Sequence, residues 1–419
     1  MLDRKTPPPF THDTGFKLLE PVRKTFPNGI DIFFVSGGKQ EVLKIEAVLR
    51  AGRWFETKKA CAQFTASLLN KGTSKRSSFE IAQLFDKYGA HLEINPGHDY
   101  ISVAVYGLTK HLEPVFDLFC EILTEASYPE KELSQHQSVT IQNLKVNQEK
   151  TSYIASQLFR KKLFGSDHPY GVDVQESDIL ALTTDDLKQY HGRFFTNMSL
   201  FVSGMITPNA QTAISDRFQS WKTLAVEADP TYPLMTTQFN EHVQKEGAVQ
   251  ASLRMGMRSI QRDHADYASV IFVSHILGGY FGSRLMKNIR EEKGLTYGIY
   301  ASLHPLQRDA YLVIGTDVNK ENIHLTIDEI QKELRLLASS PVADDELSTA
   351  KNHFIGSLQS EITTPFAHTD KIKTIFLGNL PQDYYQRIIR EITSLSSDDI
   401  MRISSEYFSA DDFSVVSVG

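Results

Sequence analysis

Cysteine is scarce in this sequence: among 419 residues there are two, Cys61 and Cys120. Neither lies in a Cys-x-x-Cys or Cys-x-x-His spacing, so neither a thiolate zinc site nor a disulfide framework is indicated. Each stands inside an apolar helical pattern. We therefore predict two buried thiols in a protein of a reducing compartment.

Excess basic charge and long apolar runs are also missing. Lys and Arg number 44 against 51 Asp and Glu, a net charge of -7, so no overall positive field attracts nucleic acid. No stretch reaches about 18 uninterrupted apolar residues, and the opening MLDRKTPPPFTHD lacks an apolar run of signal-peptide length. We expect a cytoplasmic protein with no nucleic-acid or membrane partner. P-loop, G-x-G-x-x-G and G-x-S-x-G motifs are absent, which gives nucleotide and serine-hydrolase chemistry no support.

The sequence does contain enough core material for two domains. It is 41% hydrophobic and 23% charged, as in soluble globular proteins, and its length suits two cores better than one. Apolar patterns predict strands at 30–36, 42–52, 91–95, 100–107 and 199–204, and helices at 58–70, 78–89, 111–124, 130–148 and 153–164. A further helix, capped by Thr183 or Thr184, precedes the last of these strands.

Two segments of the first half recur in the second half, in the same order. VLRAGRW at 48–54 corresponds to SLRMGMR at 252–258, and ALTTDDLKQYHGRFFTNMSLFVSG corresponds to the C-terminal SLSSDDIMRISSEYFSADDFSVVSVG. Two ordered matches indicate an internal duplication. We predict an α+β fold of two homologous domains, each a mainly antiparallel sheet flanked by helices, in a clamshell arrangement with the chemistry in the cleft. The domains are placed at 1–222 and 241–419, joined by a linker at 223–240 that has two prolines and no clear period.

The segment GGYFGSRLMKNIREEKGLTYGIYAS at 278–302 carries the most distinctive local pattern. Its apolar residues predict the buried face of a helix that Ser283 caps and Gly294 ends. Arg290 and Tyr297 then stand across this helix end, so a guanidinium and a phenol can point at one spot. Both are hydrogen-bond donors suited to a peptide carbonyl or a developing oxyanion. The predicted buried residues are Leu285, Ile289 and Leu295.

SRLMKNIREEKGLTY resembles the second-domain signature of the insulinase/pitrilysin-type zinc peptidases, or inverzincins, which include mitochondrial processing peptidases and the core proteins of respiratory complex III. RAGRWFET, NKGTSKRSSFEIAQLFDKYGAHLEINPGHDY and GSDHPYG resemble further segments of that family, so the likeness extends over most of the chain. The resemblance implies two half-barrel-like α+β domains, in agreement with the duplication.

By the same resemblance, the segment CAQFTASLLNKGT lacks the metal-binding motif of the family. Family members that hydrolyse peptides carry H-x-x-E-H on this helix, with two zinc-binding imidazoles and a Glu that activates water. Here Gln63, Ala66 and Ser67 stand at those places, and the third ligand position matches Asn143, or Gln142 if the register slips by one. Such side chains are poor zinc ligands or none. The resemblance implies that this chain has no metal site and no cofactor, and that zinc belongs to a partner chain.

The leading hypothesis is a zinc-peptidase-like subunit that pairs with an H-x-x-E-H-bearing subunit of the same family and encloses unstructured peptides. Arg290 and Tyr297 would be its catalytic contribution to the composite site, binding the substrate carbonyl. The plainer interpretation makes Arg290 a surface ion-pair partner and Tyr297 a core strand residue. On the same plainer interpretation, Gln63, Ala66 and Ser67 form a small polar helix face that packs against the cleft wall.

Three alternatives stay open. The chain is a non-catalytic scaffold or peptide-binding protein of the same fold, like the core proteins of complex III, and holds an extended peptide against a sheet edge. It is an independent metallopeptidase whose ligands lie elsewhere in the chain. Purified alone, it pairs with a second copy of itself. The state of Arg290 and Tyr297 discriminates the first alternative from the leading hypothesis, since a scaffold would pack both against their own domain.

Overall fold

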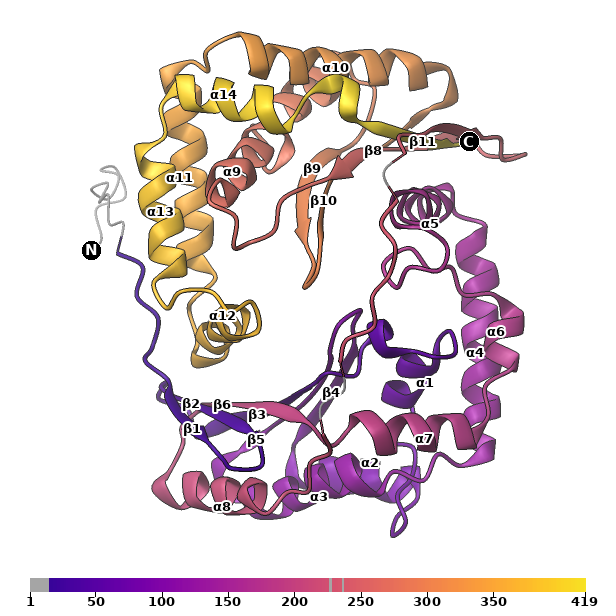
Figure 1. Cartoon of the computed structure of the whole chain (residues 1–419), viewed down its shortest axis with the longest axis vertical. Coiled ribbons are helices and arrows are strands. Elements are labelled where there is room, and N and C mark those ends of the chain that lie inside the picture. The colour runs from indigo at the N-terminus through magenta and orange to yellow at the C-terminus, as the bar shows by residue number, and fades with distance from the viewer. Residues whose placement is uncertain (1–14, 226–227, 236) are drawn as a thin grey trace, which may run out of the picture.

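The computed structural model describes residues 15–225, 228–235 and 237–419. The opening segment MLDRKTPPPFTHD, on which the expectation about a signal peptide rests, lies outside these residues. Two halves, each with one sheet and its own helices, face each other and are connected along their sides (Figure 1).

Within the described residues, no helix has both the length and the apolar character needed to cross a membrane.

The first sheet has six strands in the order β1-β2-β6-β3-β5-β4. The β2 and β6 strands run parallel, and every other neighbouring pair is antiparallel. The β4 strand is one edge of this sheet. The strands are β1 Val22–Thr25, β2 Asp31–Ser36, β3 Val42–Leu49, β4 His91–Pro96, β5 Ile101–Leu108 and β6 Met198–Gly204.

The second sheet has five strands in the order β7-β11-β8-β10-β9. Only β7 and β11 are parallel neighbours among these strands. The β9 strand is an edge, with β10 on its one paired side. The strands are β7 Asn240–Val243, β8 Gln250–Arg258, β9 Ile299–Pro305, β10 Ala310–Asn319 and β11 Ser414–Val418.

The two sheets repeat one connection pattern, because β2-β6-β3-β5-β4 corresponds strand for strand to β7-β11-β8-β10-β9, with the parallel pair in the same place. The helix before the last strand of each half begins with the same capping box: Thr183 accepts from the Asp186 N–H, and Ser396 accepts from the Asp399 N–H. The predicted fold of two homologous α+β domains is confirmed. Of the two predicted caps, Thr183 is the residue that acts.

The helices cover the sheets and connect the halves (Figure 1). In the first half they are α1 Cys61–Ser67, α2 Ser78–Tyr88, α3 Leu112–Glu125, α4 Glu130–Gln148, α5 Thr151–Phe164, α6 Glu176–Leu180, α7 Thr184–Phe194 and α8 Pro208–Gln219. In the second half they are α9 Tyr267–Gly278, α10 Ile323–Ser339, α11 Asp344–Ser360, α12 Pro365–Leu377, α13 Tyr384–Ser394 and α14 Ser397–Tyr407. Short turns of helix are η1 Arg53–Phe55, η2 Thr109–His111, η4 Lys320–Asn322 and η5 Ala410–Asp412, and η3 Met286–Glu292 is a π-helix.

Each half lends one helix to the sheet of the other half. Helix α5 of the first half packs on β8 and β11, and α12 of the second half packs on β2 and β6. Apolar clusters fill both junctions: Phe159 of α5 lies with Val416, and Ile372 of α12 lies with Phe33 and Phe201. Each domain also has its own core, and the core of the first contains both predicted buried thiols, Cys61 and Cys120. The helix exchange joins the halves through apolar contacts that neither makes alone.

A buried ionic cluster adds to the junction at α12. Glu46 on β3 is 2% exposed, and its carboxylate binds Lys373 Nζ of α12 at 2.6 Å and Lys44 Nζ at 2.7 Å. The Ser102 hydroxyl donates to the same carboxylate at 2.6 Å. Lys44, 4% exposed, also faces Asp370 of α12 at 3.5 Å. The first sheet and α12 are therefore held together by charge as well as by apolar packing.

The connection between α8 and β7 forms neither helix nor strand in its described residues, and it contacts both halves. The indole N–H of Trp54 donates to the Pro230 carbonyl at 3.1 Å. Asp229 pairs with Arg308 of the second half at 2.5 Å. The predicted linker, 223–240, overlaps this connection; its bounds and those of the two domains stay predictions.

Candidate functional site

Helix α1 begins three residues later than predicted because its start is fixed by an acid outside it. The carboxylate of Glu56 accepts the backbone N–H of Ala60 at 3.1 Å and of Ala62 at 2.9 Å. Ala60 is left-handed, with φ +67°, so the helix cannot extend further toward the N-terminus. Burial raises the pKa of Glu56 to about 7, against the charge of Arg53 and the backbone hydrogen bonds, which lower it.

The predicted metal-motif positions lie on this helix. Gln63 and Ser67 are one turn apart and half-buried, while Ala66 is fully buried at 0% exposure. Helix α4 reaches α1 through a ring contact of 4.8 Å between His136 and Phe64. Asn143, two turns further along α4, is exposed.

These residues do not fit a zinc ion. The donor set at the four positions is two amides, a hydroxyl and a methyl group, none of which ionises to hold zinc near neutral pH. In the described part of the chain, no group of three His, Cys, Asp or Glu side chains is arranged to hold a metal ion.

Arg290 lies in η3, the π-helix of the second half. Asn288 fixes this helix on α10, because its amide donates to Glu329 at 3.0 Å and to Glu333 at 2.7 Å. The Arg290 guanidinium lies over the ring of Phe281, with its carbon 4.5 Å from the ring centre. It has no ion pair among the described residues, so the plainer interpretation of Arg290 as a surface ion-pair partner is not what the structure shows.

The end of η3 leads directly to Tyr297. Gly294 has φ +63°, and the next N–H, of Leu295, donates to the Ile289 carbonyl at 3.0 Å, so the predicted glycine helix end is confirmed. Tyr297 follows at 93% exposure, two residues before β9, and is not a core strand residue. In the described structure no hydrogen bond or ring contact joins Tyr297 to Arg290.

Ser283 does not cap the helix as predicted. The residue is buried, and its hydroxyl has no hydrogen-bond partner in the described part of the chain. Leu285 and Ile289 are fully buried as predicted, while Leu295 is half-buried. The neighbouring Arg284 binds Glu346 of α11 through two bonds of 2.8 and 3.0 Å, which makes it a structural residue.

Two arginines that act on His98 were not predicted from the sequence, Arg53 of η1 and Arg160 of α5. Both are half-buried, and each affects the pKa of His98 in the turn between β4 and β5. No motif marks them, because one follows β3 and the other lies in a helix more than 100 residues later. Only the folded chain brings them together.

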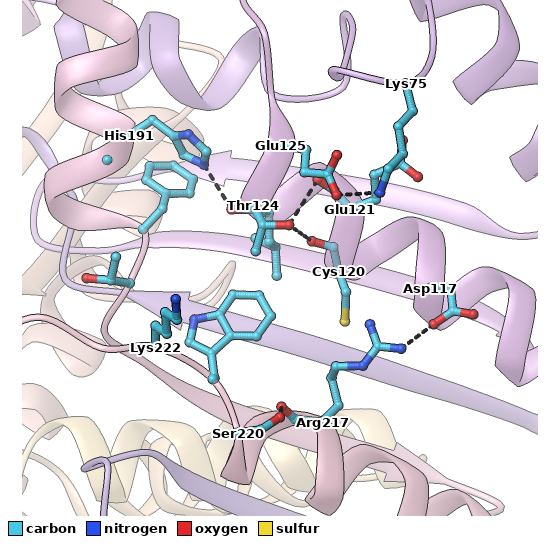
Figure 2. A pocket seen from close by; sticks show the side chains of 15 residues that line it. Lys75, Asp117, Cys120, Glu121, Thr124, Glu125, His191, Arg217, Ser220 and Lys222 are labelled. Atoms are coloured by element: carbon cyan, nitrogen blue, oxygen red, sulfur yellow. Dashed lines mark hydrogen bonds and ion pairs between the residues drawn. The ribbon is translucent and has the colours of Figure 1, made fainter.

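A separate pocket lies on the outer side of the first half, between α3, α7 and α8 (Figure 2). Its charged groups pair locally: Arg217 with Asp117 at 2.5 Å, and Lys75 with Glu125 at 2.6 Å. The His191 ring bonds to the Leu123 carbonyl at 2.9 Å. All the residues that line it come from 75–222, so it contains neither Arg290 nor Tyr297.

A duplicated α+β chain whose motif positions on α1 and α4 carry no metal ligand defines a peptidase-like class of protein without the metal motif. Family models agree with this: the description "Insulinase (Peptidase family M16)" matches residues 38–167, and "Peptidase M16 inactive domain" matches residues 181–354. The chain belongs to the insulinase, or M16, peptidase family.

Relatives and solved structures cover nearly the whole chain. An "uncharacterized zinc protease YmxG" of Bacillus subtilis is 23% identical over 93% of this chain and 96% of its own length. A "non-peptidase homolog YmxG" of Helicobacter pylori is 20% identical over 81% of this chain and 79% of its own. A crystal structure of a peptidase M16 inactive domain from Pseudomonas fluorescens superposes with a TM-score of 0.87 at 23% identity, covering 96% of this chain and 98% of that one. A protease from Helicobacter pylori superposes at 0.86 and 19% identity, covering 96% and 100%.

Proposed function

We propose that this chain is the non-catalytic subunit of a two-chain peptidase and that a zinc-bearing subunit of the same family completes the site. The observation that carries the proposal is a contrast between two places in the chain. The metal-motif positions of α1 carry no ionisable ligand, while Tyr297 is 93% exposed and Arg290 has no acid partner in the described residues. An exposed phenol and a guanidinium without an acid partner suit a ligand that arrives from outside.

In this proposal the two side chains act on the peptide rather than on the metal. The Tyr297 hydroxyl donates a hydrogen bond to the oxygen of the carbonyl under attack and stabilises the charge that develops there. The Arg290 guanidinium, stacked on Phe281, binds the neighbouring substrate backbone. The edge strand β9 begins two residues after Tyr297 and offers unpaired backbone groups to an extended peptide.

The experiment mixes the purified chain with the zinc-bearing relative encoded in the same genome and follows cleavage of an unstructured peptide. We expect Tyr297→Phe to lower turnover by about 100- to 1,000-fold, as loss of one oxyanion donor typically does. Tyr88→Phe is the matched control, because it removes a phenol hydroxyl from α2, away from the proposed site. It should leave turnover unchanged.

Two results would overturn the proposal: full activity of the relative by itself, or equal turnover of the mixture with parent chain and with Tyr297→Phe. The second result, with peptide binding intact, would favour the scaffold alternative. The positions of the two residues do not favour one alternative alone. Tyr297 is exposed, as the composite peptidase requires, whereas Arg290 packs on Phe281 of its own domain, as expected of a scaffold.

A further inference from the structure

Two histidines of the second half meet between α9 and α11, which pack side by side (Figure 1). The Nε2 atom of His275 on α9 lies 3.2 Å from the Nδ1 atom of His353 on α11. The centres of the two rings are 5.1 Å apart. His275 is half-buried and His353 is exposed, so the pair can be reached from solvent.

Aromatic neighbours hold the ring of His275 in place. Tyr280 stacks on it with the ring centres 4.8 Å apart and an interplanar angle of 14°, and Phe354 meets it edge-on at 5.3 Å. Gly279 leaves room for the ring, because a Cβ at that position would lie 2.7 Å from Nδ1 of His275. The packing thus fixes the direction of Nε2 before any ligand arrives, which is what the groups around a metal ligand do in known sites.

The separation of the two nitrogens is that of two ligands on one metal ion. Imidazole nitrogens bind zinc and similar ions at about 2.0–2.1 Å, so two of them at an angle of about 90–110° lie roughly 2.9–3.4 Å apart. The distance of 3.2 Å between Nε2 and Nδ1 falls inside this range.

Water is left to complete the coordination. In the described part of the chain, no third His, Cys, Asp or Glu joins the pair. The hydroxyl of Ser357, one turn further along α11, lies 3.5 Å from Nδ1 of His353, where it can bond to a water on the metal. An ion held in this way has two protein ligands and several exchangeable positions.

The protonation of the two rings is compatible with a metal. Without one, the two facing nitrogens share a single hydrogen bond. A metal needs the lone pairs of both, so the protons of the two neutral rings must sit on Nδ1 of His275 and Nε2 of His353. This is a change of tautomer that releases no net proton, and neutral imidazole is the form that prevails above its ordinary pKa of about 6.5.

We propose that His275 and His353 form a binding site for a late first-row transition-metal dication, of the class of Ni²⁺, Cu²⁺ and Zn²⁺. Imidazole nitrogens favour such ions over Mg²⁺ and Ca²⁺, which prefer oxygen ligands. The site is separate from the metal-motif positions on α1 and α4, and it does not depend on the proposed pairing with a zinc-bearing subunit. With two protein ligands it exchanges its ion with the solution, so binding is measured at equilibrium and not after desalting.

The site adjoins the segment that leads to Arg290. Tyr280, whose ring stacks on His275, is followed directly by Phe281. The Arg290 guanidinium lies over the ring of Phe281. A metal ion on the histidine pair would therefore join α9 to α11 at the point where this segment begins.

Isothermal titration calorimetry of the chain without an affinity tag, with nickel chloride at about pH 7.5, tests the site. We expect the parent to bind about one Ni²⁺ per chain through this pair. His275→Gln and His353→Gln should each weaken that binding at least about tenfold, since even the loss of an outer-shell partner typically costs 10- to 100-fold. His324→Gln is the matched control, because His324 is an exposed histidine on α10. Magnesium chloride should show no binding that depends on His353.

Thermal unfolding is the second readout. Ni²⁺ should raise the Tm of the parent and of His324→Gln more than that of His353→Gln, because only the folded chain brings the two rings together. His353 is exposed, so His353→Gln retains the fold and decides the test even if His275→Gln does not fold. No binding of Ni²⁺ by the parent, or equal binding by the parent and His353→Gln, overturns the inference. Either result leaves the proposed function standing.

Discussion

Replacing Glu46 by alanine tests how the buried ionic cluster holds α12 on the first sheet. The change would leave Lys44, 4% exposed, facing only Asp370 at 3.5 Å, with Lys373 as a second positive charge close by. Removing one partner of a buried ion pair typically costs about 3–5 kcal/mol, because the remaining charge stays desolvated. We expect Glu46→Ala to lower the free energy of unfolding by that amount.

The sign of the pH dependence follows from the carboxyl group. Burial raises the pKa of Glu46, but the charges of Lys373 and Lys44 outweigh it, so the pKa lies below the ordinary 4.5. The stabilisation is present above pH 4.5 and is lost as the pH falls through the lowered pKa. The difference between parent and Glu46→Ala should therefore narrow in acid.

Urea unfolding followed by tryptophan fluorescence measures this effect, because Trp54 is 6% exposed within the apolar cluster between the halves. Asp383→Ala is the matched control: Asp383, just before α13, also binds two cations, Arg387 at 2.6 Å and Arg390 at 3.2 Å, but its side chain is 44% exposed and makes no cap hydrogen bond. Its loss should change the unfolding midpoint little. If Glu46→Ala costs no more than Asp383→Ala, the reasoning about the buried cluster is wrong.

Two further variants test the start of α1 and its metal-motif positions. Burial raises the pKa of Glu56 to about 7, so the free energy of unfolding of the parent should fall as the pH rises from 4.5 to 7. The loss is on the order of 3 kcal/mol at 1.36 kcal/mol per pKa unit. Glu56→Gln should abolish this pH dependence of the urea midpoint, and an equal dependence in parent and variant would contradict the reasoning. The triple variant Gln63→His, Ser67→His and Asn143→Glu should retain about one zinc per chain after desalting, measured by elemental analysis, while the parent retains none. A folded variant without zinc would show that α1 and α4 do not present these positions to one point. Ala66 is left unchanged because it is fully buried.

Local patterns predicted most elements because they depend on neighbours in the sequence. The predicted helix 130–148 matches α4, and 153–164 matches α5 to within two residues at its start. Of the predicted helix 58–70, Cys61–Ser67 is helical, and its late start follows from the Glu56 carboxylate and the left-handed Ala60, which fix the first turn. Such a cap depends on a side chain outside the apolar period.

Features that depend on distant segments could not be predicted. The stripe of Ala155, Phe159 and Leu163 on α5 indicates an apolar face, but no local pattern tells that this face packs on the sheet of the other half. The π-helix η3 also departs from the helical period on which the prediction for 283–294 rested. The effect of Arg53 and Arg160 on His98 is also a product of tertiary structure, since the three residues come from separate elements.

The exchange of α5 and α12 has a consequence for how the chain is made. On the ribosome, the first sheet is complete when β6 ends at Gly204, but its cover, α12, ends at Leu377. At about 5–20 residues per second, the roughly 170 residues between them take about 9–35 s to synthesise. During that interval the face bearing Phe33 and Phe201 has no native cover, so the nascent chain exposes an apolar surface of the kind that chaperones bind.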